Sequence, residues 1–163
     1  MGTPLAIGLP VALERPHARG RLELASSDPR VQPLIQLNFA ADPEDLRRLM
    51  AGVCLAWQIA HQPEIARHMH HVALLSEETV GSDDALAAYV RATFSTQFHP
   101  CGTARTGPAG DPMAVVDQHC RLRTIANLRV VDASVMPAIP RANINLTCIM
   151  IGEHVSDWMR DEA

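Results

Sequence analysis

The feature of this sequence that most limits the fold is the stretch from Gln97 to Asn145, where polar residues able to do chemistry sit at turns between short apolar runs. It begins QFHPCGTARTG, passes through VVD and LRVVDASVMP, and ends IPRANIN. Because His99 precedes Pro100, its backbone should be extended, and Gly102 should then allow a sharp turn. A strand–loop–helix arrangement places such side chains where they converge on a ligand and not in a packed core. The stretch therefore predicts a site built from loops.

A strongly apolar helical pattern follows this stretch. Asn143 and Asn145 lie just before it, in positions where Asn commonly caps a helix. We expect the helix to run from about 146 to 160. The side chains that fall on its period are Met150, Ile151, His154, Val155 and Trp158. Within the stretch itself, short strands are expected at 114–116, 121–123 and 128–131.

The first part of the chain predicts strands followed by helices, and hence an α+β fold class. Residues 4–12 look extended, residues 20–25 alternate polar and apolar, and residues 31–39 supply a further strand. Asp42 is a good N-cap because Pro43 and two acidic residues follow it. An apolar helical face comes next, with core as its expected role and Trp57 as its largest buried side chain: Leu46, Leu49, Met50, Val53, Trp57 and Ala60. A short helix at 63–70 and another beginning at Ser82 complete the pattern.

The composition is that of an ordinary globular protein, with 163 residues, 47% hydrophobic residues and a net charge of −4. No basic patch is interleaved with aromatic residues and the pI is near 6.0, so no nucleic-acid partner is expected. No apolar run is long enough to span a bilayer. Residues 1–12 lack the basic start of a signal peptide, so a cytoplasmic location is expected. The four cysteines are widely spaced, which favours reduced thiols over a disulfide framework.

Several ordered motifs resemble a known family. The segments HPCGTARTG, AVVD, LRVVDASVMP and N-I-N before IMIGEHVSDWM resemble the C-terminal signature of the glucose–methanol–choline (GMC) flavin oxidoreductases. Upstream, P-H-A-R-G, LELASSDP and PLIQLNFAADPEDLRRLMAGV are similar to the start of the family's substrate domain. The resemblance covers nearly the whole chain. It departs from the family at Thr106, where Met is common, and at Ala18, where Ser often stands.

The resemblance implies a catalytic pair. His99 falls on the family's catalytic histidine, and Asn143 falls on the second catalytic position, 44 residues later (143 − 99 = 44), which is His or Asn among members. Oxidising an alcohol removes a hydroxyl proton, and a neutral His suits that task near pH 7. Asn143 cannot take a proton, so it would hydrogen-bond the substrate oxygen as charge builds there. Taken without the resemblance, a His in such a loop is more often structural, and Asn143 is equally a capping residue.

The resemblance also implies a cofactor. No side chain can accept a hydride, so an organic group is required, and in the family it is FAD. The backbone at Ala133, next to Asp132, would approach the ribityl-phosphate region, and Asn145 corresponds to a further flavin-contacting position. Asp132 is also a candidate helix or turn cap, and the two roles are compatible. The helix after Asn145 would direct its positive N-terminal end at the flavin, which would favour the reduced form.

No G-x-G-x-x-G pattern opens a βαβ unit in this chain, although a full family member binds the FAD pyrophosphate with such a fold. The resemblance therefore predicts the C-terminal part of a larger enzyme. Residues 1–112 would form antiparallel substrate-domain strands with helices, and residues 113–163 would return to complete the FAD-binding domain. We expect an incomplete FAD site, a small-molecule alcohol as substrate, a separate or missing N-terminal flavin-binding domain as partner, and no activity from the chain by itself.

Two alternatives stay open at this point. In the first, the chain is a non-catalytic truncated remnant that keeps the motifs, and in the second it is a small metal-binding module. In the second case Glu64, His68 and His71 would be the ligands, because their spacing of four and three residues places them on one face of a helix. A zinc site would need further ligands from other elements, and solvated surface histidines are the simpler expectation.

Overall fold

The computed structural model describes residues 8–162. The expectation of an extended segment at 4–12 therefore lies outside the described residues at positions 4–7. The chain divides into two compact units, Met1–Ser95 and Thr96–Ala163. Their fold class is α+β, with helices and a small antiparallel sheet, as predicted. The predicted boundary at 112/113 concerns function and stays a prediction. No helix among residues 8–162 is long and apolar enough to cross a membrane.

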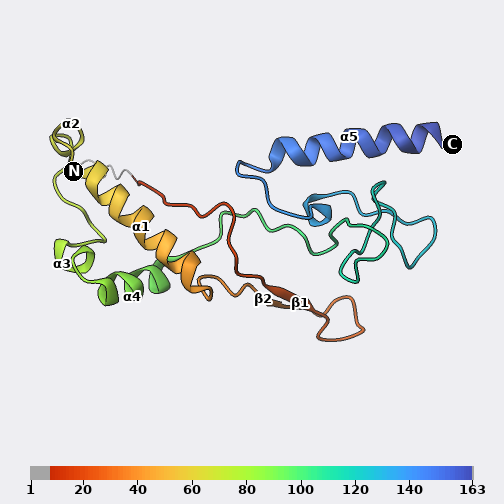
Figure 1. Ribbon diagram of the computed structural model, residues 1–163, viewed down its shortest axis with the longest axis horizontal. Coiled ribbons are helices and arrows are strands. Elements are labelled where there is room, and N and C mark those ends of the chain that lie inside the picture. Colours follow the sequence, from red (N-terminus) through yellow and green to blue (C-terminus); the bar gives the residue numbers. More distant parts are fainter. Residues whose placement is uncertain (1–7, 163) are drawn as a thin grey trace. The chain divides into compact units, whose positions relative to one another are not determined.

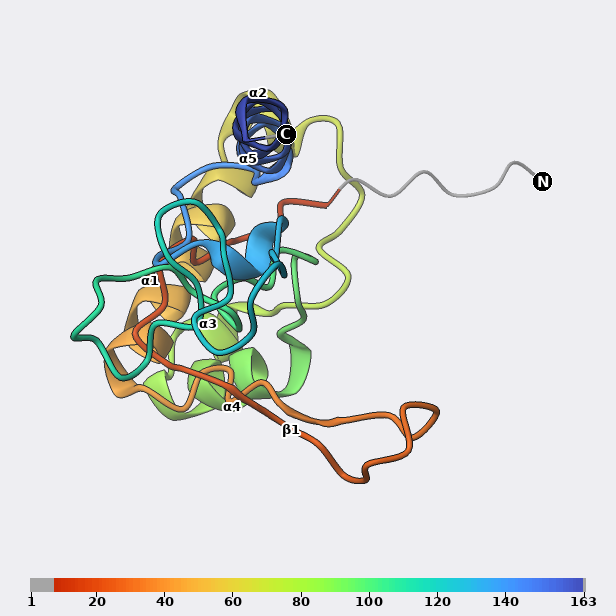
Figure 2. The ribbon, with the colours of Figure 1, turned by 90° about the vertical axis from the view of Figure 1, so that its right-hand side faces the viewer.

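The first unit begins with a two-stranded antiparallel hairpin, β1 (Arg21–Glu23) and β2 (Leu34–Gln36), with Leu22 opposite Ile35 (Figure 1). Both strands are shorter than predicted. Pro33 has no N–H for the ladder, and after β2 Asn38 and Ala40 have φ of 54° and 53°, which ends the extended backbone. Figure 2 shows the hairpin projecting from the helices of its own unit, and its large apolar side chains are exposed: Leu22, Leu24, Leu34, Ile35 and Leu37.

Helix α1 (Pro43–Ala60) begins where the sequence predicts it. The Asp42 carboxylate accepts the backbone N–H of Glu44 at 2.9 Å and of Asp45 at 3.1 Å, and Pro43 occupies the first helical position. Of its predicted core face, Leu46 and Ala60 are buried and the other members are half-buried. Trp57, expected to supply the largest buried surface of this face, is half-buried, and its ring lies against the ring of His61, with centroids 4.1 Å apart. That it buries the largest area stays a prediction.

Three further helices complete the first unit: α2 (Pro63–Ala66), α3 (Glu77–Val80) and α4 (Asp83–Thr93). The predicted start of α4 is confirmed, since the Ser82 hydroxyl accepts the N–H of Ala85 at 3.4 Å. The buried side chains of α4 are Leu86 and Val90, and α4 packs against α1. The sequence did not predict α3, which Ser76 caps.

Helix α2 ends earlier than predicted, because after Ala66 the chain tightens into turns. The N–H groups of His68 and Met69 bond to carbonyls three residues back, at 3.0 Å each. Glu64, His68 and His71 therefore do not share one helix face. The side chains of His68, His70 and His71 are exposed, in agreement with solvated surface histidines.

The second unit consists of turns packed beneath one long helix, α5 (Asn145–Asp161), which begins one residue earlier than predicted. A short 3₁₀ helix, η1 (Ala133–Val135), lies under it. The buried cluster is Val116, Cys120, Val135 and Val155, and Ile151 and Trp158 of α5 pack against it. The strands predicted at 114–116, 121–123 and 128–131 are reduced to isolated bridges. Left-handed residues at Cys120 and Asn127 (φ 61° and 60°) interrupt them.

Candidate active site

The predicted site residues lie in the second unit, and two of its turns are bonded side by side. The N–H groups of Gly102, Ala104 and Thr106 donate to the carbonyls of the three residues of η1. The pairs are Gly102 to Ala133 at 3.4 Å, Ala104 to Ser134 at 3.0 Å, and Thr106 to Val135 at 2.9 Å. Every second N–H of residues 102–106 thus bonds to one of the consecutive carbonyls of η1. This pairing anchors the segment that follows His99 to the predicted flavin-contacting Ala133.

Asp132 caps η1, which confirms the capping interpretation of this residue. Its Oδ1 accepts the backbone N–H of Ser134 at 2.8 Å and also the Ser134 hydroxyl. Ala133 is half-buried, and its small side chain leaves the turn open to close approach. The predicted contact of this turn with FAD is compatible with the cap and stays a prediction.

His99 is half-buried, and its imidazole forms no hydrogen bond with any residue of the part that the structure describes. The residue before it, Phe98, has φ 61° and an 83% exposed side chain, and its N–H donates to the Thr96 hydroxyl at 3.0 Å. A left-handed backbone at a bulky residue is strained, and such strain concentrates at functional positions. Neither ring nitrogen of His99 has a hydrogen-bond partner among residues 8–162, so both can act on a bound molecule.

Asn143 is exposed, and its side-chain Oδ1 accepts the N–H of Asn145 at 3.0 Å. The N-cap of α5 is Ile144, so Asn143 lies one residue before it and bonds the first helical N–H, whereas Asn145, also predicted to cap, is the first helical residue. The NH₂ of the Asn143 amide has no hydrogen-bond partner among residues 8–162, so it can donate to a bound group. A donor is what the predicted role beside a substrate oxygen requires. No hydrogen bond joins His99 to Asn143 within residues 8–162, so their meeting at a substrate stays a prediction.

The first turn of α5 offers further donors. Ile144 provides no side-chain cap, and Asn143 satisfies only the N–H of Asn145. Leu146, the next residue, is 77% exposed. A helix N-terminus with unpaired N–H groups carries about half a positive charge and attracts electron-rich groups. The end of α5 that the sequence predicts to face a flavin thus has the required electrostatics.

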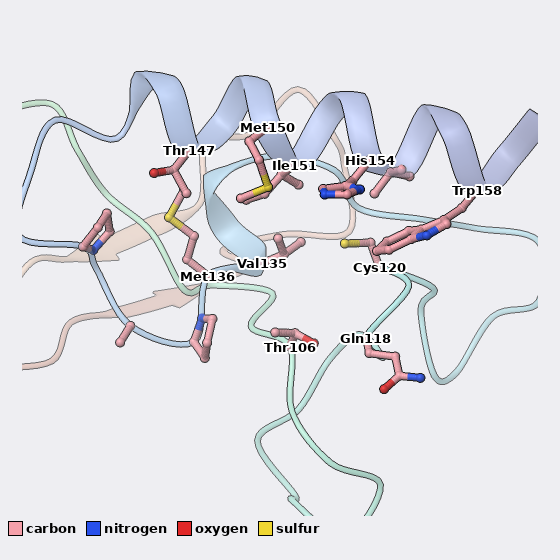
Figure 3. Close-up of a pocket in the computed structure, with 14 residues that line it drawn as sticks. Thr106, Gln118, Cys120, Val135, Met136, Thr147, Met150, Ile151, His154 and Trp158 are labelled. Atoms are coloured by element: carbon pink, nitrogen blue, oxygen red, sulfur yellow. The ribbon is translucent and has the colours of Figure 1, made fainter.

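A groove of about 340 Å³ lies beneath α5, and no motif of the sequence predicted it (Figure 3). In Figure 3 the side chains of Thr147, Met150, Ile151, His154 and Trp158 point from α5 toward the turns that carry Thr106, Cys120, Val135 and Met136. Burial raises the pKa of the Cys120 thiol, and the charge of Asp117 raises it further. The thiol therefore stays protonated near pH 7 and is no nucleophile. The helical period of the sequence indicated only the wall that α5 forms and not the wall formed by the turns.

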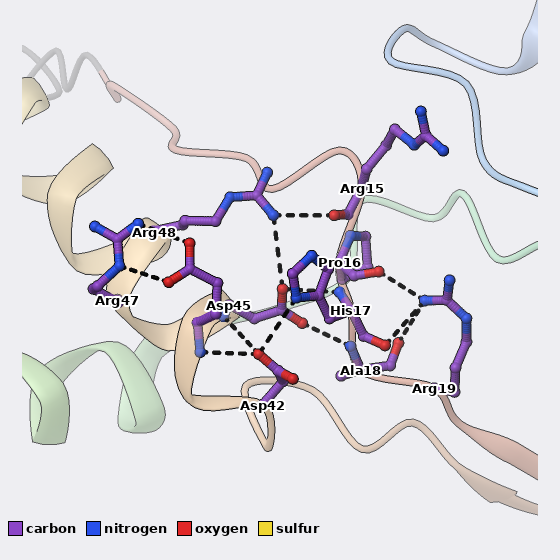
Figure 4. A network of polar contacts seen from close by, with 10 residues as sticks. Arg15, Pro16, His17, Ala18, Arg19, Asp42, Asp45, Arg47 and Arg48 are labelled. Atoms are coloured by element: carbon purple, nitrogen blue, oxygen red, sulfur yellow. Dashed lines mark hydrogen bonds and ion pairs between the residues drawn. The ribbon is translucent and has the colours of Figure 1, made fainter.

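One group among residues 8–162 has the composition of a metal site: His17, Asp42 and Asp45, with one possible ligand atom each within 4.8 Å of the others. Figure 4 shows that both carboxylate oxygens of Asp45 and one of Asp42 already accept hydrogen bonds. Asp45 accepts the backbone N–H groups of His17 and Ala18 at 2.8 Å each, and Asp42 caps α1. These hydrogen bonds therefore hold the segment around His17 against α1. The predicted ligands Glu64, His68 and His71 do not form such a group.

The family model described as GMC oxidoreductase matches residues 16–152, and it is the model of the C-terminal domain. The chain belongs to the GMC oxidoreductase family. Its resemblance to the C-terminal region of that family is therefore confirmed.

The GMC relatives are much longer than this chain. An alcohol dehydrogenase (acceptor) of Pseudomonas putida is 37% identical over 160 residues, which are 96% of this chain and 28% of the relative. Choline oxidase of Arthrobacter globiformis is 38% identical over 146 residues, 88% of this chain and 27% of that protein. The chain thus spans under a third of the length of these relatives.

Solved GMC structures share the fold. Formate oxidase of Aspergillus oryzae RIB40, the subject of a structural study of FAD modification, matches with a TM-score of 0.82 and 32% identity, over 92% of this chain and 26% of its own. A fungal aryl-alcohol oxidase matches with a TM-score of 0.79 and 30% identity, over 92% of this chain and 24% of its own. The paired turns and the long helix described above therefore belong to the GMC C-terminal fold.

Proposed function

We propose that this chain is the C-terminal part of an FAD-dependent alcohol oxidoreductase. Membership of the GMC family supports the proposal, as do relatives named for alcohol and choline oxidation. The observation that carries it furthest is the unpartnered imidazole of His99, close along the chain to a turn bonded to Ala133. A free base beside a turn open to close approach is what proton removal next to a cofactor requires.

In this proposal His99 takes the hydroxyl proton of the alcohol. A neutral imidazole accepts a proton near pH 7, and the ring has no competing partner among residues 8–162. Asn143 donates its free NH₂ to the substrate oxygen, which gains negative charge as the proton leaves. The His accepts and the Asn donates, so the two roles are chemically complementary.

FAD, when bound, supplies the hydride acceptor that no side chain provides. The residues present fit such a group in three places. Ala133 permits close approach, Asn145 opens α5, and the unpaired N–H groups of the first turn of α5 favour negative charge on a ring placed there. We assign residues 113–163 to this side and residues 1–112 mainly to the substrate side. The Gly-rich pyrophosphate site would come from a separate N-terminal flavin-binding domain.

A chimera tests this proposal. The matching region of the P. putida alcohol dehydrogenase is replaced by this chain, and bound FAD is measured by absorbance beside alcohol oxidation with an artificial electron acceptor. We expect the chimera to hold FAD and turn over. His99→Ala should then reduce kcat roughly 10²- to 10⁴-fold per bound FAD, the range of general base catalysis.

The matched control is His70→Ala, which removes an exposed imidazole from the first unit and should leave kcat unchanged. Full turnover by the His99→Ala chimera would refute the assignment of the base. A folded chimera without FAD would contradict the claim that residues 113–163 complete the flavin site. That second result would favour the remnant interpretation of the chain.

A further inference from the structure

Gly102 occupies a position that other residues cannot adopt without strain. Its φ is +86°, in the left-handed region that favours glycine. A Cβ built on it would lie 3.3 Å from the carbonyl oxygen of Met136, tighter than an ordinary contact. The neighbour in the way is backbone and not the end of a flexible side chain. Both the conformation and the space therefore require glycine here.

This glycine starts the pairing between two turns that carry different predicted roles. Its N–H donates to Ala133 O at 3.4 Å, the longest of the three bonds between the segment 102–106 and η1. The pairing is fixed at its other end, where the Thr106 hydroxyl donates to Asp117 O at 3.0 Å. The weakest bond of the set is thus the one nearest to His99.

The chain between His99 and Gly102 is short. Three residues span at most about 11 Å, so the position of Gly102 restricts the imidazole to the neighbourhood of η1. His99 has no hydrogen bond of its own among residues 8–162 to hold it there. The backbone pairing of residues 102–106 with η1 therefore restrains the segment that carries His99.

We propose that Gly102 is a positioning residue, which sets the distance between His99 and the turn at Ala133. This inference rests on the proposed function for the roles of His99 and Ala133. A Cβ at position 102 would push the segment away from Met136, break the bond to Ala133 first, and let His99 move outward. Proton transfer depends steeply on such distances, and a displacement of about 1 Å reduces rates by as much as about 100-fold.

The first test uses this chain without a cofactor. Amide hydrogen exchange is measured by NMR in the parent chain, in Gly102→Ala and in Gly110→Ala, whose Cβ would meet nothing within 4 Å. After correction for intrinsic exchange rates, we expect the amide at position 102 to lose its protection in Gly102→Ala only, with a smaller loss at Ala104, while amides inside α1 keep their protection and show that the first unit is folded. Unchanged protection at position 102 would overturn the proposal.

The second test uses the FAD-loaded chimera. Gly102→Ala should lower kcat per bound FAD roughly 10- to 100-fold with little change in KM. Gly102→Asn should retain more activity, because Asn tolerates the left-handed region that Ala avoids. A purely structural role would lower the amount of loaded enzyme and leave kcat per FAD unchanged, and that result would refute the inference. Activity lost in His99→Ala but kept in Gly102→Ala would refute the positioning role of Gly102 and leave the proposed function standing. Activity kept in both variants would refute the proposed function.

Discussion

The two compact units of this chain are stabilised in different ways. In the first unit, long helices begin at capping side chains, and their facing sides supply the buried residues Leu46, Leu86 and Val90. In the second, α5 is the one long helix among residues 96–162, and turns joined by single backbone hydrogen bonds surround a small buried cluster. All residues of the predicted catalytic pair and flavin contacts lie in the second unit. Regular structure and chemistry are thus separated, and loops held by a few long-range bonds carry the candidate site.

This difference can be measured because each unit contains one tryptophan. Trp57 lies in α1 and Trp158 packs against the cluster of the second unit. In a Trp158→Phe background the fluorescence reports the first unit, and in a Trp57→Phe background it reports the second. Each substitution below changes one unit, and the other unit serves as its control.

The largest effect is expected for Asp45→Ala in the first unit. Asp45 is 1% exposed and accepts the backbone N–H groups of His17 and Ala18 at 2.8 Å each. Its removal leaves two donors without an acceptor, which we expect to lower the free energy of unfolding by about 3 kcal/mol. Urea titration with the Trp57 reporter measures the change. Glu64→Ala, an exposed carboxylate in the same unit, should change little, and an equal loss in both variants would contradict this role for Asp45.

A smaller effect is expected for Val116→Ala in the second unit. Val116 is 0% exposed and lies at the centre of the buried cluster. Losing its methyl groups and leaving a cavity should lower the free energy of unfolding by about 2 kcal/mol. The Trp158 reporter should register the loss and the Trp57 reporter should not. Val131→Ala, at an exposed position, is the matched control; parallel shifts of both reporters would show that the units unfold together.

The smallest effect concerns acid stability of the second unit. Burial raises the pKa of Asp117, but its hydrogen bonds from the N–H groups of Arg121 and His119 outweigh this, so the pKa lies below its ordinary value. A lowered pKa stabilises the fold above the unfolded value of about 4, and this contribution is lost as the pH falls through the folded pKa. Unfolding midpoints of the second unit should therefore decrease below about pH 4.

Asp117→Asn tests the assignment of that pH dependence. The variant should be less stable than the parent at pH 7, and the difference should shrink as the pH falls and the parent carboxylate becomes protonated. Thermal melts between about pH 7 and pH 3 with the Trp158 reporter measure it. A constant difference across this range would mean that another group is responsible.

The sequence predicted those parts of the fold whose causes are local. Asp42 and Pro43 start α1 and Asp132 caps η1, while Asn143 bonds the first N–H of α5. Each acts within a few residues of its own position. The spacing of apolar residues in α5 predicted which face of the helix packs against the turns. Helix α3 and η1 were missed because four and three residues are too short to show a period. Helix α2 was predicted too long for the same reason.

The parts of the fold and site that the sequence did not predict depend on contacts between residues far apart along the chain. Gly102 and Ala133 are 31 positions apart (133 − 102 = 31), and nothing in either segment signals their bond. The groove beneath α5 was missed because only its helical wall has a period, while the opposite wall is set by this pairing. The strands predicted near Val116 reduce to single bridges, since turns containing the left-handed residues Cys120 and Asn127 separate the short extended runs. The predicted roles of His99, Asn143 and Asn145 came from the resemblance to the family and remain predictions.

The hairpin of β1 and β2 has a practical consequence. A ribbon of two strands has two outer edges, and each keeps backbone donors and acceptors that a neighbouring ribbon satisfies. Exposed leucines along the ribbon, Leu22 and Leu34 among them, would gain by the same encounter. Stability curves of this chain should therefore be compared at several protein concentrations, and a midpoint that rises with concentration would show that copies associate.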